Sequence, residues 1–388
     1  MRYLVMSCST GGGHNSAAHA VEDELIKRGH EVTFLDPYNL INDKAADKVG
    51  GAYIKLVQVA PKAFGSLYFA GEMVSKIPIM SPVYYVNGAV AYLMKKYLQK
   101  NEFDGIIMSH LYPAEMITML KNHKIELPPT FYIATDYIPI PFTAETDIDY
   151  YCVPGEDCIE DFTSRGMPRE KLIPCGIPVH ERFSGRSKGV DRAVLEQLNL
   201  SPNLRHILVV GGSVGAGSIP QVASILSGYI KRFNKKVDEG IIHSRKLHGI
   251  VICGNNDKMY KKLHSRYKEH ITVLKRTDNM SDYMKSCDIV ISKPGGLSST
   301  EAAVARVPLI HISPIPGCET FNVKYFDARG MSVYVENVRK DLASAITALL
   351  KPENRAKMLA SQEISINENA RDDWCDFVEK ITRNQGTT

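Results

Sequence analysis

The sequence lacks closely spaced cysteine pairs. Its 388 residues include eight cysteines, but no Cys-x-x-Cys pair and no spacing typical of a zinc finger. Most fall in apolar runs, as Cys8, Cys152, Cys253 and Cys287 do. We therefore expect free, buried thiols in a reducing compartment. This excludes a disulfide scaffold and a metal-finger domain.

A strong net charge and an uninterrupted apolar segment are also lacking. The formal net charge of +4 is too small to indicate nucleic acid as a partner. No charged residue lies between Lys76 and Lys95, a length near the roughly 18 residues that span a bilayer, but Pro78 and Pro82 interrupt it. Met1 leads directly into an apolar run, so we expect no signal peptide. These features exclude a membrane-spanning protein.

The chain contains two series of short apolar runs that alternate with helical periodicity. With 44% hydrophobic residues, it can bury two cores. This alternation predicts an α/β fold with two parallel sheets in two Rossmann-like domains. The predicted strands are residues 3–8, 32–35, 105–109, 130–135, 150–153 and 171–175 in the first series, and 207–210, 249–253, 271–274, 288–292 and 307–312 in the second.

Residues 176–204 are rich in Gly, Pro and charge, which is typical of a connection between domains. We therefore expect an N-terminal domain over residues 1–178 and a C-terminal domain over residues 179–364. A polar helix at about residues 365–388 is expected to pack back on the first domain.

Residues 51–100 have an unusual composition, with six lysines, one acidic residue (Glu72) and eight interleaved tyrosines and phenylalanines. One interpretation is a pair of amphipathic helices that pack on the sheet. The other, which the lysine excess favours, is a surface that lies on anionic lipid headgroups.

A glycine-rich loop, Ser9–His14, separates the first predicted strand from a helix. Backbone N–H groups in such a loop can approach a ligand closely. We expect His14 at the tip of this loop, in the crevice where open α/β sheets bind ligands, and Asp136 at the same edge. A general base must sit in such a crevice, so His14 is a candidate base.

The same loop only approximates a dinucleotide-binding fingerprint. Gly11 and Gly13 are present and Asp36 follows at a suitable distance, but Ser16 stands where the third glycine belongs. A nicotinamide-dependent oxidoreductase is therefore a remote alternative.

Two loops of the second half follow neighbouring predicted strands. Ser292–Glu301 opens a helix whose N–H groups and hydroxyls can hold a diphosphate, and Glu301 can accept hydrogen bonds from sugar hydroxyls. Pro314–Asn322 follows the next strand and offers further groups to a second sugar. The plainer interpretation is that Ser298 and Thr320 cap two helices. A third glycine loop, Gly211–Gly217, converges on the same edge.

Together these motifs resemble the glycosyltransferases that include monogalactosyldiacylglycerol synthases and bacterial processive diacylglycerol glucosyltransferases. These are distant relatives of the peptidoglycan lipid-intermediate N-acetylglucosaminyltransferase. The resemblance covers essentially the whole chain. It is carried by Thr10–His14 with Ser16–Ala18, Thr135-Asp136, Cys175–Val179, Gly211–Gly215, Ser292–Gly296 with Glu301, and Gly317-x-Glu319-x-x-Asn322.

The resemblance implies a GT-B fold, with two Rossmann-like domains facing across a cleft. It implies an inverting, metal-independent transfer of a hexose from UDP-glucose or UDP-galactose to diacylglycerol, which gives a glycolipid. No cofactor is expected beyond the UDP-sugar donor. The implied partners are the donor, a diacylglycerol-like acceptor and an anionic membrane surface, and the implied location is the cytoplasmic face of the cell membrane.

The resemblance also assigns roles to residues. His14 would take the proton from the acceptor hydroxyl, with Asp136 assisting or substituting, and Gly12 and Gly13 would border the acceptor. The implied donor-binding residues are Gly212, Ser213, Gly215, Arg276, Met280, Gly295, Gly296, Ser298, Ser299, Glu301, Glu319, Thr320 and Asn322.

Other functions remain open from the residues alone. The same donor site could serve a polyprenyl-linked or soluble acceptor. The chain could also be a nucleotide-sugar-binding protein without catalytic activity. A retaining glycoside hydrolase is disfavoured, because we find no pair of closely spaced carboxylates.

Overall fold

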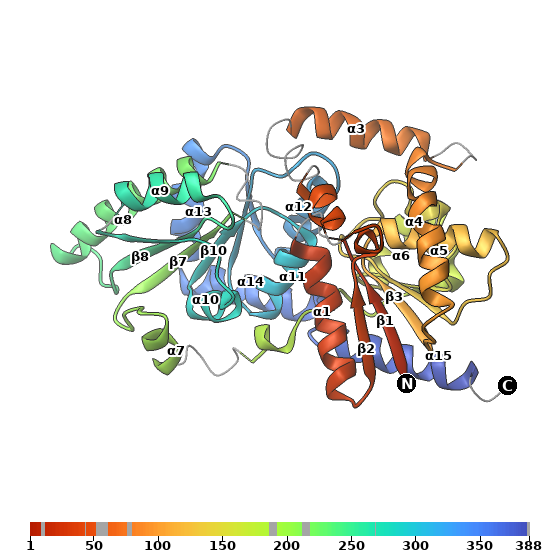
Figure 1. The fold of residues 1–388 in the computed structure, drawn as a ribbon. Coiled ribbons are helices and arrows are strands. Elements are labelled where there is room, and N and C mark those ends of the chain that lie inside the picture. The colour runs from red at the N-terminus through yellow and green to blue at the C-terminus, as the bar shows by residue number, and fades with distance from the viewer. Residues whose placement is uncertain are drawn as a thin grey trace. The chain divides into compact units, whose positions relative to one another are not determined.

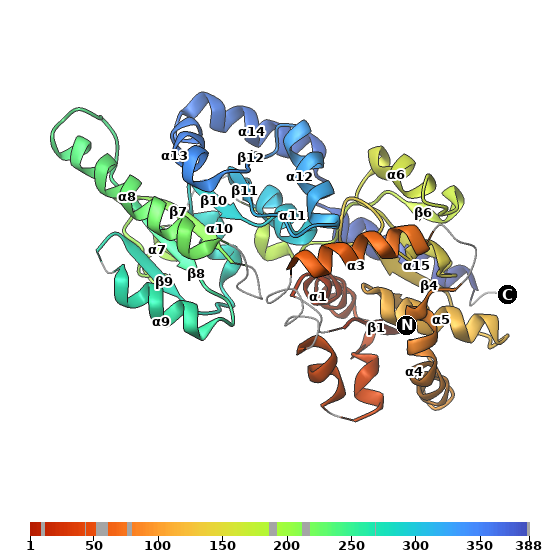
Figure 2. The same cartoon turned by 90° about the horizontal axis from the view of Figure 1, so that it is seen from above.

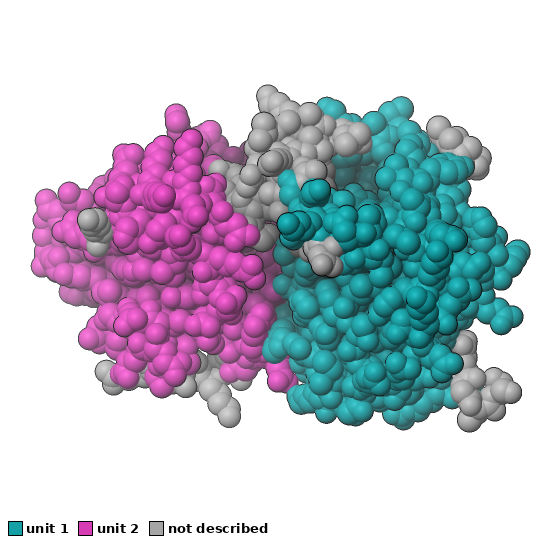
Figure 3. All heavy atoms as spheres, in the orientation of Figure 1, with its two compact units in different colours: residues 1–180, 316–321, 367–388 teal, residues 181–315, 322–366 magenta. Residues whose placement is uncertain are grey.

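The computed structural model describes residues 1–8, 12–42, 44–51, 61–75, 80–185, 192–211, 218–267 and 269–385. The chain divides into two compact units (Figure 3). Unit 1 comprises residues 1–180, 316–321 and 367–388, and unit 2 comprises residues 181–315 and 322–366. Each unit contains a six-stranded parallel sheet with flanking helices (Figure 1). The predicted α/β fold with two parallel sheets is therefore confirmed.

The sheet of unit 1 has the strand order β2-β1-β3-β4-β5-β6. Its strands are β1 (Arg2–Met6), β2 (Glu31–Leu35), β3 (Gly105–Met108), β4 (Thr130–Ile133), β5 (Tyr150–Cys152) and β6 (Leu172–Ile173). The residues of β1 from Tyr3 to Met6 are fully buried, as expected for a central parallel strand covered on both faces. In register, Leu4 lies opposite Thr33 of β2 and Ile106 of β3.

The helices of unit 1 are α1 (Gly12–Lys27), α3 (Pro61–Val74), α4 (Pro82–Leu98), α5 (Leu111–Asn122), α6 (Ile159–Thr163) and α15 (Ala370–Gln385). Short 3-10 turns are η1 (Pro37–Leu40), η2 (Thr143–Glu145), η3 (Glu156–Cys158) and η4 (Arg169–Lys171). Because β3 and β4 follow β1 in the sheet, their carboxyl ends lie next to the start of α1.

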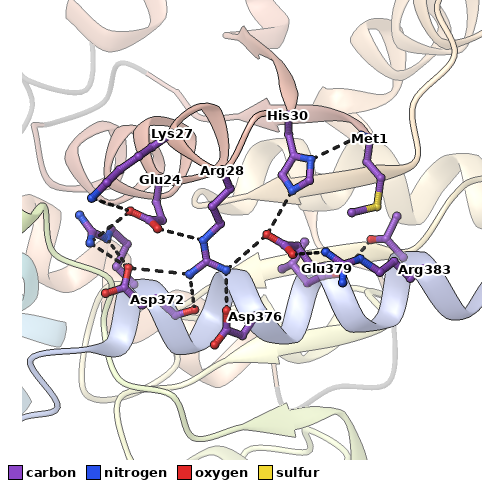
Figure 4. A network of polar contacts seen from close by, with 12 residues as sticks. Met1, Glu24, Lys27, Arg28, His30, Asp372, Asp376, Glu379 and Arg383 are labelled. Atoms are coloured by element: carbon purple, nitrogen blue, oxygen red, sulfur yellow. Dashed lines mark hydrogen bonds and ion pairs between the residues drawn. The ribbon is translucent and has the colours of Figure 1, made fainter.

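The C-terminal helix α15 packs on α1 within unit 1. Trp374 of α15 is completely buried, and its ring contacts Phe131 of β4 edge to face. Figure 4 shows Arg28, the residue after α1, between carboxylates, where it pairs with Glu24 of α1 at 2.9 Å and with Glu379 of α15 at 3.3 Å. An aromatic anchor and an ion-pair network therefore fix α15 to this unit.

Helix α4 agrees with part of each interpretation of residues 51–100. It packs against α5, and Tyr84, Val90 and Met94 are buried. Other large apolar side chains stay exposed, including Tyr85 at 67% and Val86 at 74%. The helix is thus amphipathic against its own unit and still presents apolar groups to solvent. Residues 52–60 and 76–79 of this segment lie outside the described residues.

The sheet of unit 2 has the order β12-β11-β10-β7-β8-β9. Its strands are β7 (Arg205–Val210), β8 (Leu247–Ile252), β9 (Ile271–Leu274), β10 (Ile289–Ser292), β11 (Leu309–Ile312) and β12 (Val333–Val335). The edge strand β12 was not predicted. The core lies between this sheet and its helices, with Val209, Leu226 and Ile291 among its buried members.

The remaining elements are η5 (Glu181–Phe183), α7 (Arg192–Gln197), α8 (Ile219–Asp238), α9 (Asp257–Arg266), α10 (Met280–Ser286), α11 (Gly296–Val304), α12 (Cys318–Ala328), α13 (Val338–Leu349) and α14 (Pro352–Ser365). Helix α8 lies beside α13 (Figure 2). All eight cysteines are free thiols, as predicted. In the part of the chain that is described, no helix combines the length and the apolar character needed to cross a bilayer.

Candidate active site

His14 lies in the first turn of α1, directly after β1. We expected it at the tip of a loop, and that expectation is wrong because helix α1 already begins at Gly12. The side chain of His14 is half-buried. Gly12 and Gly13 form the same turn and are also half-buried, while Ser9, Thr10 and Gly11 lie outside the described residues. The histidine is therefore held by a helix.

The contacts of the His14 ring define which of its nitrogens carries a proton. Its Nδ1 atom lies 2.7 Å from the carbonyl oxygen of Ser109 and 3.0 Å from Oγ1 of Thr135. A carbonyl oxygen can only accept a hydrogen bond, so Nδ1 must donate. In the neutral ring, Nε2 then carries the lone pair. This is the tautomer that a general base requires at Nε2.

Burial also favours the neutral ring. Burial lowers the pKa of His14 below its ordinary value, while the charge of Asp136 and the hydrogen bond to Ser109 partly oppose this effect. At neutral pH the imidazole is therefore mainly unprotonated and able to take up a proton.

A pocket of unit 1 brings His14 and Asp136 together at the carboxyl ends of β1 and β4. Asp136 follows β4 by three residues and is half-buried. Besides these two residues, the pocket is lined by Tyr132, Ala134, Thr135, Ile138, Pro139, Ile140, Thr143 and Phe162. The lining mixes polar and apolar side chains, and His14 and Asp136 are its two groups that can act as a base.

Sequence reasoning missed Ser109 and His110, which follow β3. The His110 ring lies edge-on to the His14 ring, with centroids 4.6 Å apart. Its Nδ1 atom accepts a hydrogen bond from the backbone N–H of Tyr112 at 3.1 Å and so caps α5. Burial and the neighbouring His14 lower the pKa of His110 well below its usual range. The sequence offered one signal for these two residues, because the predicted strand 105–109 ends at Ser109 and strand ends of this sheet carry site residues.

In unit 2, the loop after β10 opens helix α11. Gly295 is the N-cap residue, Gly296 begins the helix, and no side chain caps it. The alternative that Ser298 is the cap is therefore wrong. Its hydroxyl instead donates to the carbonyl oxygen of Gly295 at 3.2 Å and is half-buried. The first backbone N–H groups of α11 thus have no side-chain cap.

Glu301 lies in the second turn of α11 and is half-buried. Burial raises the pKa of Glu301 to about 8, although the charge of Arg182 opposes the shift. A carboxyl group with this pKa changes its charge within the physiological range of pH.

Two residues expected to contact the donor directly point into the interior of unit 2. Ser299 is fully buried, and its hydroxyl bonds to Nε2 of His311 at 2.9 Å. Asn322 is also fully buried, and its Nδ2 atom donates to the carbonyl oxygen of Pro294 at 2.9 Å. Both expectations are corrected, because the packing of α11 and α12 turns these side chains inward. Asn322 instead supports the loop that precedes α11.

The other predicted donor contacts are more accessible. Arg276 is exposed beside Asp278, and Met280 begins α10 and is half-buried. Glu319 and Thr320 lie in the first turn of α12 and are half-buried. Gly212, Ser213 and Gly215 lie outside the described residues. Within the described ranges, no group of three or more His, Cys, Asp or Glu side chains could hold a metal ion.

Comparisons with known proteins assign both halves of the chain. Residues 14–179 match the model of the monogalactosyldiacylglycerol (MGDG) synthase family, and residues 206–373 match the glycosyltransferase family 28 C-terminal domain. The chain is 22% identical over 357 residues to a processive diacylglycerol beta-glucosyltransferase of Bacillus subtilis (strain 168). The match covers 91% of this chain and 88% of that protein.

Solved structures share the fold. MurG of Acinetobacter baumannii superposes with a TM-score of 0.62 at 15% identity, covering 98% of this chain and 99% of that one. UDP-GlcNAc 2-epimerase of Neisseria meningitidis, bound to UDP-GlcNAc, superposes with a TM-score of 0.65 at 14% identity. The superposition covers 98% of this chain and 100% of that one. The predicted GT-B fold is therefore confirmed. Models of glycosyltransferase families thus match both halves of the chain, which is similar over nearly its whole length to the processive diacylglycerol glucosyltransferases.

Proposed function

We propose that this protein transfers a hexose from UDP-glucose or UDP-galactose to diacylglycerol, with inversion at the anomeric carbon and without a metal ion. The observation that carries the proposal is the His14 ring, whose Nδ1 is committed to Ser109 and whose Nε2 is left as a base. The relatives named as diacylglycerol glucosyltransferases supply the acceptor class.

On the acceptor side, Nε2 of His14 takes the proton of the primary hydroxyl as its oxygen attacks the anomeric carbon. The bond from that carbon to the diphosphate breaks, and UDP leaves. Asp136 stabilises the imidazolium ion that forms, in keeping with its effect on the pKa of His14. A single base acting opposite the leaving group gives inversion.

On the donor side, negative charge develops on the diphosphate as UDP departs. The N-terminal N–H groups of α11 at Gly295 and Gly296, which no side chain caps, are suited to that charge, and the Ser298 hydroxyl would join them by exchanging its hydrogen bond to the carbonyl oxygen of Gly295. Glu301 would accept hydrogen bonds from the ribose, and Glu319 from the hexose. Arg276 would add a positive charge near the nucleotide.

The acceptor is a lipid, so the protein must reach a membrane surface. Exposed apolar side chains gather on α3 and α4, together with Lys95 and Lys96 of α4. These side chains are Phe69, Met73, Tyr85, Val86 and Tyr92. Such a mixture suits the boundary between headgroups and acyl chains. We therefore place the enzyme peripherally on the inner face of the cell membrane.

A donor screen tests the proposal. Purified protein is incubated with UDP-glucose, UDP-galactose or UDP-N-acetylglucosamine and diacylglycerol in mixed micelles that contain a chelator. Products are identified by mass, and their anomeric configuration by NMR. We expect a hexosyl lipid with a β linkage from one of the first two donors. The proposal fails if no donor yields glycolipid, or if only a polyprenyl or soluble acceptor is glycosylated.

A further inference from the structure

The positive charge of this chain is concentrated in one stretch of unit 2. Residues 219–276 contain thirteen basic residues (Lys and Arg) but only four acidic ones (Asp and Glu). The whole chain has 47 basic and 43 acidic residues. The rest of the chain is therefore slightly acidic. This stretch comprises α8, β8, α9 and β9, with the connections between them.

Most of these basic side chains lie on the solvent faces of α8 and α9. The buried faces are apolar: Val222, Leu226 and Ile230 of α8, and Met259 and Leu263 of α9. The two helices contact each other. We call their exposed basic residues the basic face. They are Lys231, Arg232, Lys235, Lys236, Lys258, Lys261, Lys262 and Arg266.

Acidic neighbours neutralise one member of this face, Lys235, and two basic residues outside it, Lys246 and Lys275. Glu239 pairs with Lys235 at 3.6 Å, Asp238 with Lys246 at 2.6 Å, and Asp257 with Lys275 at 2.8 Å. The fourth acid of the stretch, Glu269, lies beside His270. Among the described residues, no carboxylate lies within ion-pair distance of Lys231, Lys236, Lys258, Lys261 or Lys262.

Stabilisation of the helices themselves accounts for only part of the basic face, namely Lys235, Lys236 and Arg266 in the last turns. Basic residues favour only the last turn of a helix, through the helix dipole. Lys258 lies in the first turn of α9, where a positive charge is unfavourable, and Lys231 is about two turns from the end of α8. This placement indicates an anionic partner outside the chain.

The topology gathers much of this charge at one end of unit 2. Because α8 and α9 join parallel strands, both helices run back to the amino ends of the strands. The connection from α8 to β8 lies there, and it carries Arg245, Lys246 and the 64% exposed Ile241. The donor-side loops before α11 and α12 lie at the opposite, carboxyl ends.

We propose that the basic face, with Ile241 at its tip, binds an anionic lipid bilayer. Lysines and arginines would meet the headgroups while the isoleucine enters the apolar boundary. An exposed aliphatic side chain favours this partner over a nucleic acid, whose phosphate backbone offers it no contact. Unit 2 would thus hold the membrane through a surface separate from α3 and α4 of unit 1.

The test compares binding to vesicles of phosphatidylcholine alone and with 30 mol% phosphatidylglycerol. The variant carries Lys236→Gln, Lys262→Gln and Arg266→Gln. The matched control carries Lys340→Gln, Lys351→Gln and Lys357→Gln, three exposed lysines elsewhere in unit 2. Each basic residue near an anionic surface contributes about a fivefold change in partitioning. The variant should therefore bind the anionic vesicles about 100-fold more weakly, and the control much less so.

Further measurements make the outcome decisive. Thermal unfolding should show that both triple variants remain folded, with a small loss of stability in the basic-face variant because Lys236 and Arg266 lie in the last turns of α8 and α9. Turnover with micellar acceptor should stay unchanged, since none of these residues touches the proposed active site. Ile241→Ser alone should weaken binding severalfold. Equal vesicle binding by variant and control would overturn the proposal. So would salt-sensitive binding of a 30-nucleotide RNA duplex by the basic face, without vesicle binding.

Discussion

The Nδ1 atom of His14 lies 2.7 Å from the carbonyl oxygen of Ser109, so a main-chain group after β3 selects the tautomer of a side chain after β1. These residues are 95 positions apart, and they meet because β1 and β3 are neighbours in the parallel sheet. The contact leaves Nε2 of His14 as the proton acceptor.

His14→Ala should lower kcat by a factor of about 10² to 10⁴, the range that general-base catalysis contributes. UDP binding, measured by calorimetry, should stay within about twofold, because His14 belongs to the acceptor side and most of the proposed donor residues lie in unit 2. The matched control is His19→Ala, an exposed histidine of the same helix that pairs with Glu22. Full activity of the His14→Ala variant would show that His14 is not the catalytic base.

His110 should act on the reaction through His14. Replacing His110 with Ala admits water beside the His14 ring, so the pKa of His14 should rise and the acidic limb of the kcat/KM profile should move up by roughly half a pH unit or more. His110→Asn keeps a side chain that can cap α5, and it separates this effect from loss of the cap. If His110 serves only as a cap, the acidic limb will not move in either variant.

UDP binding should depend on pH through Glu301. Burial raises the pKa of this carboxyl to about 8, and the ionised form accepts hydrogen bonds from ribose hydroxyls better than the protonated form. Affinity should therefore increase as pH rises from 6 to 8.5, by calorimetric titration. Glu301→Gln cannot ionise and should show a flat profile in the same range. An equally steep profile in both proteins would assign the dependence to another group.

Acid should destabilise unit 2 through two neutral histidines. Nε2 of His206 donates to the carbonyl oxygen of Ser201, so its Nδ1 atom accepts a hydrogen bond from Nδ1 of His248 at 3.2 Å. Burial lowers the pKa of both rings, that of His248 to about 4. The folded pKa lies below the unfolded one, so this stability is complete above about pH 6.5 and is lost as pH falls toward 4.

For His248 alone, the loss at low pH amounts to at most about 3 kcal/mol. Urea unfolding between pH 7.5 and 4.5 measures it. In His248→Gln the free energy of unfolding should fall less steeply between pH 6.5 and 4.5. Replacement of the exposed His243 with Gln should leave the dependence of this free energy on pH unchanged. Identical profiles for all three proteins would contradict this account.

Arg28 should be the most important polar residue in docking α15. Its side chain is 21% exposed and pairs with acids of α1 and α15 (Figure 4). Arg28→Ala removes charged hydrogen bonds to Glu24 and Glu379, which keep Arg371 at 3.2 Å and Arg383 at 2.6 Å as partners, and should cost about 1.5–3 kcal/mol in urea unfolding. Arg383→Ala removes an ion pair with Glu379 whose arginine side chain is 66% exposed, and it should cost less than about 1 kcal/mol. Similar costs would indicate that Trp374, and not the ion pairs, fixes the helix.

The secondary structure was predictable because its signals are local. Buried parallel strands appear as short apolar runs, and all predicted strands are present, whereas β12 was not predicted. The start of α1 was misplaced because glycines favour loops by propensity, and here the helix begins within them at Gly12.

The sequence by itself determined two parallel α/β sheets, the strand ends that carry His14 and Asp136, and the glycine-rich opening of α11, because each depends on residues close together in the chain. Only the tertiary structure decided which strands are neighbours, and therefore that Ser109 and His110 surround His14. It also decided that Ser299 and Asn322 point inward, since the rotation of a helix is set by packing against its sheet. Contacts between residues distant in the chain leave no periodic signal in the sequence.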